Sequence, residues 1–230
     1  YEGMSDLSPN GELFLYVARK PETPEREQSA YTHKWTAISR PPYFTALALW
    51  PIGDSWDGGG YFVDDDMVWL CHASARAHPD HRPRGLRVIN TYERERFAEC
   101  AVRDGWERVQ EGRFSSERSS LRGTTEQPAI WQKRQPSGRY LLVTELYREP
   151  DFETASLSYL TEADDQSASQ TLIEATTWID WDHRGRLVFA REGQLYAAEA
   201  PFDLATAQLL ADFNANTPER MEAPVWARRW

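Results

Sequence analysis

Hydrophobic and polar residues alternate in short runs that are separated by turns, and this pattern predicts β-strands. The clearest example is residues 178–198, where apolar runs at 178–181, 187–190 and 195–197 are separated by polar turns ending at Gly185 and Gly193. Short β-branched and aromatic runs joined by Asp/Gly turns are typical of antiparallel meanders. We therefore expect three consecutive antiparallel strands in this stretch.

The same turn phrase occurs upstream, each time before an apolar run. It is found as Ser8-Pro9-Asn10-Gly11, as Gln135-Pro136-Ser137-Gly138 and, in a weaker form, as Asp64-Asp65-Asp66. The last turn residues of the four phrases are separated by 55, 72 and 47 positions. A propeller blade repeats at about 40–50 residues. Repeated meanders at this loose spacing predict a β-propeller with insertions.

We expect a single all-β domain, a β-propeller of four antiparallel blades. The approximate repeats are residues 4–52, 58–110, 127–176 and 177–217. The long interval between the second and third phrases makes five blades the alternative. The tail at 221–230 contains an apolar strand-like run, which would complete the first blade and close the ring, so that no sheet edge stays open.

Two further segments have a predicted conformation. The run at 97–102 is expected to be a strand, and both cysteines, Cys71 and Cys100, are placed in strands. After Asp203 the sequence allows either a short helix capped by this aspartate, reaching residue 210, or a loop followed by a strand at 208–213.

The turn phrases resemble those of bacterial propellers of the WD-repeat and TolB-like kind, in which a Ser/Pro-Asp/Asn-Gly turn precedes an apolar strand in each blade. The matching residues are 8–11, 136–138 and 182–185. Residues 35–60 are also similar to a segment of uncharacterised bacterial proteins. The resemblance implies a propeller architecture and specifies no activity.

Composition and charge narrow the function. Of 230 residues, 40% are hydrophobic and 27% charged, which is typical of a globular protein, and no run approaches the roughly 18 apolar residues of a spanning helix. The net charge of −10 argues against binding of nucleic acid or membranes and favours a basic protein partner.

Two cysteines form no disulfide framework, so we expect buried free thiols and a cytoplasmic protein, with one disulfide as the alternative. The chain starts at Tyr1 and not at a methionine, so the sequence leaves open whether a leader segment has been removed.

No nucleotide-binding loop, nucleophile elbow or zinc-protease motif is present, and we expect no cofactor. Zinc-competent side chains do occur together, at Cys71, His72, His78, Asp80 and His81. Their spacing matches no standard site, and the segment reads as a solvated loop. We therefore expect no metal.

The candidate contact residues are Arg40, Trp56, Asp57, Asp64 and Asp65. Trp56 lies in a glycine-rich loop, where an aromatic ring suits a sugar or a partner protein. The aspartates would suit a glycoside hydrolase or a cation, but they are also good turn formers.

The favoured function is a non-catalytic module that recognises another protein through propeller loops. A carbohydrate-binding or glycoside-hydrolysing propeller that uses the loop tryptophan and aspartates is the alternative.

Overall fold

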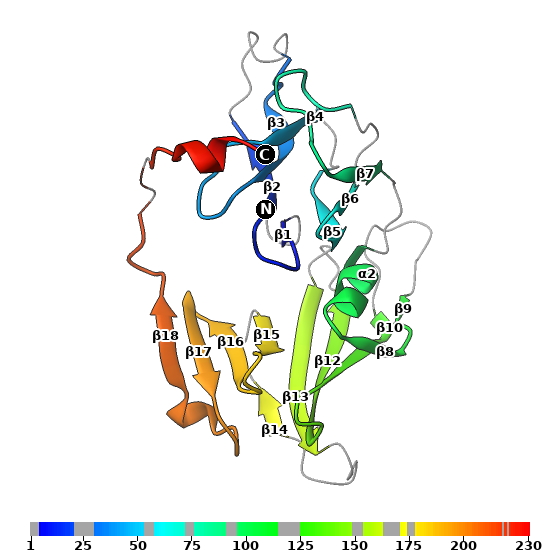
Figure 1. Cartoon of the computed structure of the whole chain (residues 1–230). Helices are drawn as coiled ribbons and strands as arrows, with labels where there is room; N and C mark the ends of the chain where they lie inside the picture. The colour runs from blue at the N-terminus through cyan, green and yellow to red at the C-terminus, as the bar shows by residue number, and fades with distance from the viewer. Residues whose placement is uncertain are drawn as a thin grey trace. The chain divides into compact units, whose positions relative to one another are not determined.

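The chain folds into a series of β-sheets in the computed structural model of Figure 1. The structure describes residues 5–20, 30–52, 58–71, 76–90, 96–114, 125–148, 154–162, 171–173, 178–217, 219 and 221–230. The chain divides into two compact units. The first unit consists of Tyr1–Arg103 and Glu219–Trp230, and the second unit is Asp104–Pro218.

The first unit contains a four-stranded and a three-stranded sheet. The four-stranded sheet is an antiparallel meander in the order β1-β2-β3-β4, with β1 at Asp6–Leu7, β2 at Phe14–Arg19, β3 at Lys34–Ser39 and β4 at Ala48–Ile52. The other sheet has the order β5-β6-β7, with β5 at Gly60–Asp64, β6 at Met67–Leu70 and β7 at Arg87–Asn90. Strands β5 and β6 pair antiparallel, whereas β7 lies parallel to β6.

The second unit contains two larger antiparallel sheets and one small one. The five-stranded sheet has the order β14-β13-β12-β11-β8, with β8 at Glu107–Gln110, β11 at Ala129–Arg134, β12 at Tyr140–Arg148, β13 at Thr154–Glu162 and β14 at Thr171–Ile173. The four-stranded sheet is β15-β16-β17-β18, at Trp178–Trp181, Leu187–Arg191, Gln194–Ala198 and Gln208–Asp212. A two-stranded sheet pairs β9 at Arg113–Phe114 with β10 at Thr125–Gln127.

Each unit has a core made by two sheets that follow one another in the sequence. In the first unit, Leu15, Ile38 and Trp50 of the first sheet pack with Phe62 and Val68 of the second. In the second unit, the core cluster draws on both large sheets and contains Leu142, Leu160, Ile173, Ile179, Trp181, Leu187 and Phe189. Full burial of a large apolar side chain contributes about 1.5–3 kcal/mol. The strand content and the sheets make the chain an all-β protein of several antiparallel sheets, as the pattern of apolar runs and turns predicts.

The turn phrases form the same structure in three sheets. In each, the amide of the terminal glycine donates to the carbonyl three residues earlier, at 2.7 Å for Gly11, 2.8 Å for Gly138 and 2.9 Å for Gly185. These glycines have φ values of 75°, 79° and 76°, a left-handed region that other residues enter at a cost. Each phrase joins β1 to β2, β11 to β12 or β15 to β16. The three glycine turns therefore share one local conformation.

Within each unit, the turns of consecutive sheets contact one another. The amide of Asn10 donates to Asp65 Oδ1 at 2.9 Å, and Gln135 Nε2 donates to the Gly185 carbonyl at 2.6 Å. Beside the second of these contacts, Lys133 of β11 forms an ion pair of 2.6 Å with Asp180 of β15. In both units, hydrogen bonds thus connect corresponding turns of two successive sheets. In the second unit, an ion pair also connects the strands β11 and β15.

The prediction of a strand at 97–102 is wrong, because helix α2 occupies Arg96–Arg103. The segment contains the good helix formers alanine, glutamate and arginine. Its end is held by Arg103, whose two terminal nitrogens contact the Asp6 carboxylate at 2.5 and 3.1 Å, while Nη1 also donates to the Phe62 carbonyl at 2.6 Å. The cysteines are free thiols, as expected, but both are partly exposed, and Cys100 lies in the helix.

The tail joins the first unit, but not as the strand that the sequence predicts. It forms a 3₁₀ helix at Val225–Arg228, preceded by Pro224, which has no amide hydrogen to pair in a sheet. Trp230 packs against the first core and donates from Nε1 to the Leu47 carbonyl at 3.2 Å. Figure 1 shows this red segment beside β3.

The segment after Asp203 combines both sequence-based alternatives. Asp203 accepts the Ala205 amide at the start of a 3₁₀ helix, Leu204–Thr206, and β18 follows. No helix in the described residues is long and apolar enough to cross a membrane.

Candidate functional site

The first sheet of the first unit carries a pocket on the face opposite its core. Side chains alternate between the two faces of a strand, so Leu15 enters the core while Phe14 and Tyr16 point to the other face. On that face, Ala18 lies directly across from Trp35 of β3. The pocket has a volume of about 710 Å³. Ligand sites usually occupy about 300–1,000 Å³.

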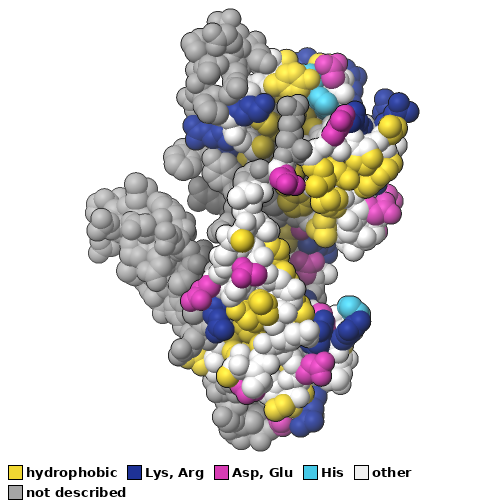
Figure 2. Space-filling model, turned by 90° about the vertical axis from the view of Figure 1, so that its left-hand side faces the viewer, with side chains coloured by type: hydrophobic (Ala, Val, Ile, Leu, Met, Phe, Trp, Pro, Cys, Tyr) yellow, Lys and Arg dark blue, Asp and Glu magenta, His cyan; other side chains and the backbone are white. Residues whose placement is uncertain are grey.

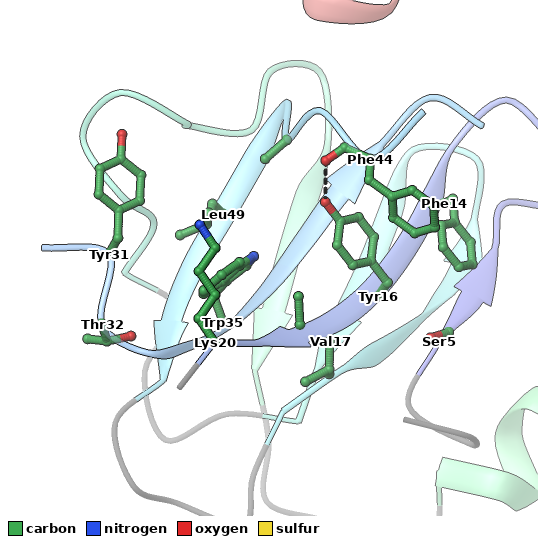
Figure 3. Close-up of a pocket in the computed structure, with 12 residues that line it drawn as sticks. Ser5, Phe14, Tyr16, Val17, Lys20, Tyr31, Thr32, Trp35, Phe44 and Leu49 are labelled. Atoms are coloured by element: carbon green, nitrogen blue, oxygen red, sulfur yellow. Dashed lines mark hydrogen bonds between the residues drawn. The ribbon is translucent and has the colours of Figure 1, made fainter. Parts of the chain in front are cut away.

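Aromatic and aliphatic side chains form most of the lining. The described lining residues are Ser5, Phe14, Tyr16, Val17, Ala18, Lys20, Tyr31, Thr32, Trp35, Phe44, Ala46 and Leu49. Apart from Ser5, which precedes β1, they come from β2, β3, β4 and the connections between these strands (Figure 3). The sheet therefore supplies the floor, and the connections supply the rim.

Three rings make one end of the pocket. Phe14 stacks on Tyr16 with ring centroids 5.6 Å apart, and Phe44 meets both rings edge-on, at 6.0 and 5.1 Å. The Tyr16 hydroxyl donates to the Phe44 backbone carbonyl at 2.7 Å, which ties the β3–β4 connection to β2. Burial raises the pKa of Tyr16 to about 12, so this hydroxyl keeps its proton near neutral pH. The Phe44 ring itself is 69% exposed.

The other end contains the cationic group of the lining. Lys20 extends along Trp35, with Nζ 5.6 Å from the ring centroid, which is within cation–π range (Figure 3). Tyr31 and Thr32 lie at the same end. The Thr32 hydroxyl is 2.7 Å from the Lys34 carbonyl and 3.2 Å from the Ile52 carbonyl, so it is already bonded inside the protein. The pocket therefore has an aromatic end and a cationic end.

Two histidines support the rim at Tyr31. The Tyr31 ring stacks on the buried His78 imidazole with centroids 3.9 Å apart, and its hydroxyl lies 3.3 Å from His81 Nε2. His81 Nδ1 is 3.0 Å from the Ala46 carbonyl. If Nδ1 carries the proton, Nε2 is the acceptor for the tyrosine hydroxyl. The histidine loop also pairs with β4, since the His78 amide donates to Leu49 at 2.8 Å.

The zinc-competent side chains that the structure describes do not come together as a metal centre. His78 and His81 lie near one another with ring centroids 5.5 Å apart, but they pack and hydrogen-bond as described. Asp80 Oδ2 is 4.0 Å from His78 Nδ1. His72 lies outside the described residues. Among those that are described, no group of three or more His, Cys, Asp or Glu side chains could hold a metal ion.

The predicted contact residues occupy other places. Arg40 lies 3.6 Å from Glu12 and donates to the Arg229 carbonyl at 3.5 Å. Asp64 accepts the Asp66 amide at 2.8 Å, and Asp65 accepts the Asn10 amide, so both aspartates serve turn geometry. Trp56 and Asp57 lie outside the described residues. None of Arg40, Asp64 and Asp65 is among the described lining residues of the pocket.

Sequence analysis did not find the pocket residues, although one signal was present. Residues 14–18 are apolar without interruption. A strand with one face in water would alternate between apolar and polar residues. Large aromatic residues at 14 and 16 therefore indicate that the second face of β2 is also covered or used.

Comparisons of the chain with protein-family models, with curated proteins and with solved structures find no match. The likeness to WD-repeat and TolB-like propellers thus rests on the turn phrases. The pocket must be interpreted from its own chemistry.

Proposed function

We propose that this chain is a protein-recognition module whose pocket receives apolar side chains of a partner. The observation that carries the proposal is the aromatic pocket of about 710 Å³ with Phe44 69% exposed at its rim. Exposed apolar surface next to a formed hollow is typical of interaction sites, where buried aromatic residues supply much of the binding energy. In the space-filling view, apolar side chains gather on the exposed surface of the first unit (Figure 2).

The chemistry of the lining favours a protein partner over the alternative, a carbohydrate. A sugar has many hydroxyl groups, and each one that is buried without a partner costs free energy. The described lining contains no Asp, Glu, Asn or Gln, and the hydroxyls of Tyr16 and Thr32 already bond within the chain. Such a lining suits leucine-like or aromatic side chains better than it suits a sugar ring.

We also propose that the sheets are blades of a β-propeller, with four blades favoured over five. Three observations support this arrangement: the consecutive meanders, the similar conformation of the glycine turns, and the contacts between corresponding turns of successive sheets within each unit. Recognition would then use loops between blade strands, because Tyr31 and Phe44 belong to the β2–β3 and β3–β4 connections. The two free cysteines support a cytoplasmic location.

The test is a selection of peptides from a random seven-residue library displayed on phage, with the whole protein as the target. Selected peptides are synthesised, and their dissociation constants are measured by fluorescence anisotropy. Phe44→Ser should weaken binding about 10-fold or more, because the partner would bury the exposed Phe44 ring and full burial of such a side chain contributes about 1.5–3 kcal/mol.

The matched control is Phe213→Ser, since Phe213 is also an exposed phenylalanine, at 52%, but belongs to the second unit and does not line the pocket. Equal affinity in the Phe44 variant, or the same loss in both variants, would contradict the proposal. Saturable binding on a glycan array that is lost in Phe44→Ser would establish the carbohydrate alternative instead.

A further inference from the structure

We propose that the pocket selects partner segments in which a carboxylate stands two residues from a large apolar side chain, with the carboxylate against Lys20. This inference rests on the proposed function, and it specifies the chemistry of the partner at that same pocket. The observation behind it is the polarity of the site, which has aromatic rings at one end and an ammonium group at the other.

The arrangement of side chains sets both parts of the preference. Phe14, Tyr16 and Phe44 offer ring faces and edges to an apolar group. Lys20 crosses the Trp35 ring toward the other end (Figure 3). An extended peptide places side chains i and i+2 about 7 Å apart on one side, whereas adjacent side chains point to opposite sides. A short segment can therefore contact both ends at once.

Among the described residues, the charge of Lys20 has no acidic partner. Its described contacts are with the Trp35 ring and, through the backbone amide, with the His33 carbonyl at 2.7 Å, and no described carboxylate pairs with the ammonium group. A cation–π contact leaves the ammonium hydrogens on the far side free to donate to an oxygen. A carboxylate at this end thus gains an ion pair, whereas a partner lysine or arginine meets a like charge.

The preference of the pocket for an acidic partner is opposite to the preference for basic partners that the net charge of the chain predicts. With a net charge of −10, the protein attracts basic partners at long range. Screening limits that attraction to about 8–10 Å at ordinary ionic strength. At contact distance the ammonium group of Lys20 dominates the described pocket lining, which holds no other charged side chain. The acidic residue of the partner is therefore recognised at the pocket itself.

The experiment uses the tightest library peptide in three synthetic forms, with Asp, Asn or Lys two positions from its largest apolar residue. On the wild-type protein at 50 mM salt, the Asp form should bind about fivefold more tightly than the Asn form, as an exposed ion pair allows, and the Lys form should bind most weakly. In Lys20→Met the Asp and Asn forms should bind equally, with the affinity of the Asn form retained. Arg82→Met is the control, because it removes an exposed cation of the first unit that does not line the pocket.

The outcomes separate this inference from the proposed function. If Phe44→Ser weakens all three forms but Lys20→Met leaves their order unchanged, the acidic preference is overturned and peptide recognition stands. If no form depends on Phe44, both are overturned. If octanoate competes with the peptides and binds more tightly than any of them, the pocket serves lipid-like carboxylates, and the inference of a peptide partner is overturned.

Discussion

The hydroxyl of Tyr16 offers a quantitative test of how the pocket is built. Tyr16→Phe removes the donor to the Phe44 carbonyl and keeps the ring that packs on Phe14 and Phe44. At pH 7 the loss of this hydrogen bond should lower the free energy of unfolding by about 1 kcal/mol. The cost arises because the Phe44 carbonyl oxygen loses its hydrogen-bond donor. Tyr16 is only 7% exposed, so water does not readily take the place of its hydroxyl.

At alkaline pH the same substitution should become favourable. Burial raises the pKa of Tyr16 from 10.0 to about 12, so between these values the unfolded chain loses the phenolic proton and the folded chain keeps it. The stabilising contribution of the Tyr16 hydroxyl is therefore fully present below pH 10, and it is lost progressively between pH 10 and about pH 12. Each unit of pH in that window removes about 1.4 kcal/mol from the wild type and nothing from the phenylalanine variant. By pH 11 the loss exceeds the neutral-pH benefit, and the variant should be slightly the more stable protein.

The assay is urea unfolding of both proteins, followed by tryptophan fluorescence, at pH 7, 9 and 11. The other nine of the ten tyrosines are present in both proteins, so their titration cancels in the difference. A difference between the two proteins that stays constant from pH 7 to 11 would refute the reasoning, because the Tyr16 hydroxyl would then be exposed in the folded protein.

Three further substitutions test the fold. Gly60→Ala would place its Cβ 2.1 Å from the Trp69 carbonyl oxygen and should lower the free energy of unfolding by about 2–3 kcal/mol; an unchanged melting temperature would contradict the close strand approach. Gly138→Ala meets no atom within 4 Å, so only its φ of +79° matters; it should cost about 1 kcal/mol in urea unfolding, and Gly138→Asn, which tolerates this region better, should cost less. For Asp182, partial burial raises the pKa, but hydrogen bonds from the Arg186 amide and guanidinium outweigh it and the pKa is lowered. Its contribution is therefore present above pH 4 and lost in acid, so Asp182→Asn should lower stability at pH 7 and match the wild type near pH 2; a deficit that is equal at both pH values would be inconsistent with this.

The strands next to the turn phrases could be predicted because their chemistry is local. A glycine that must adopt a positive φ, a polar turn and an apolar run all lie within ten residues, as at Gly138 and Gly185. The all-β class followed from the repetition of that unit.

The errors occurred where distant residues decide the conformation. Residues 97–102 allow a strand or a helix by composition, and the end of the helix is fixed by Arg103 binding to Asp6, a residue 97 positions away. The tail was correctly assigned to the first segment, yet its conformation depends on Pro224 and on the docking of Trp230 near Leu47. Neither interaction can be read from the local pattern.

The pocket could not be predicted from the sequence for the same reason. It requires the cross-strand register that puts Ala18 opposite Trp35, and it requires Phe44 to return over Tyr16. Trp56 is easy to single out in the sequence because it stands in a glycine-rich loop, whereas the second face of a strand has no such local marker.

The docking of the tail on the first unit has a consequence for synthesis. Residues 1–103 are synthesised before the second unit, but Trp230, which packs against their core, is made only after the entire second unit. During translation the surface around Leu47 is therefore left without its indole cover for as long as the second unit takes to emerge. That surface is covered only when residues 219–230 have emerged and docked.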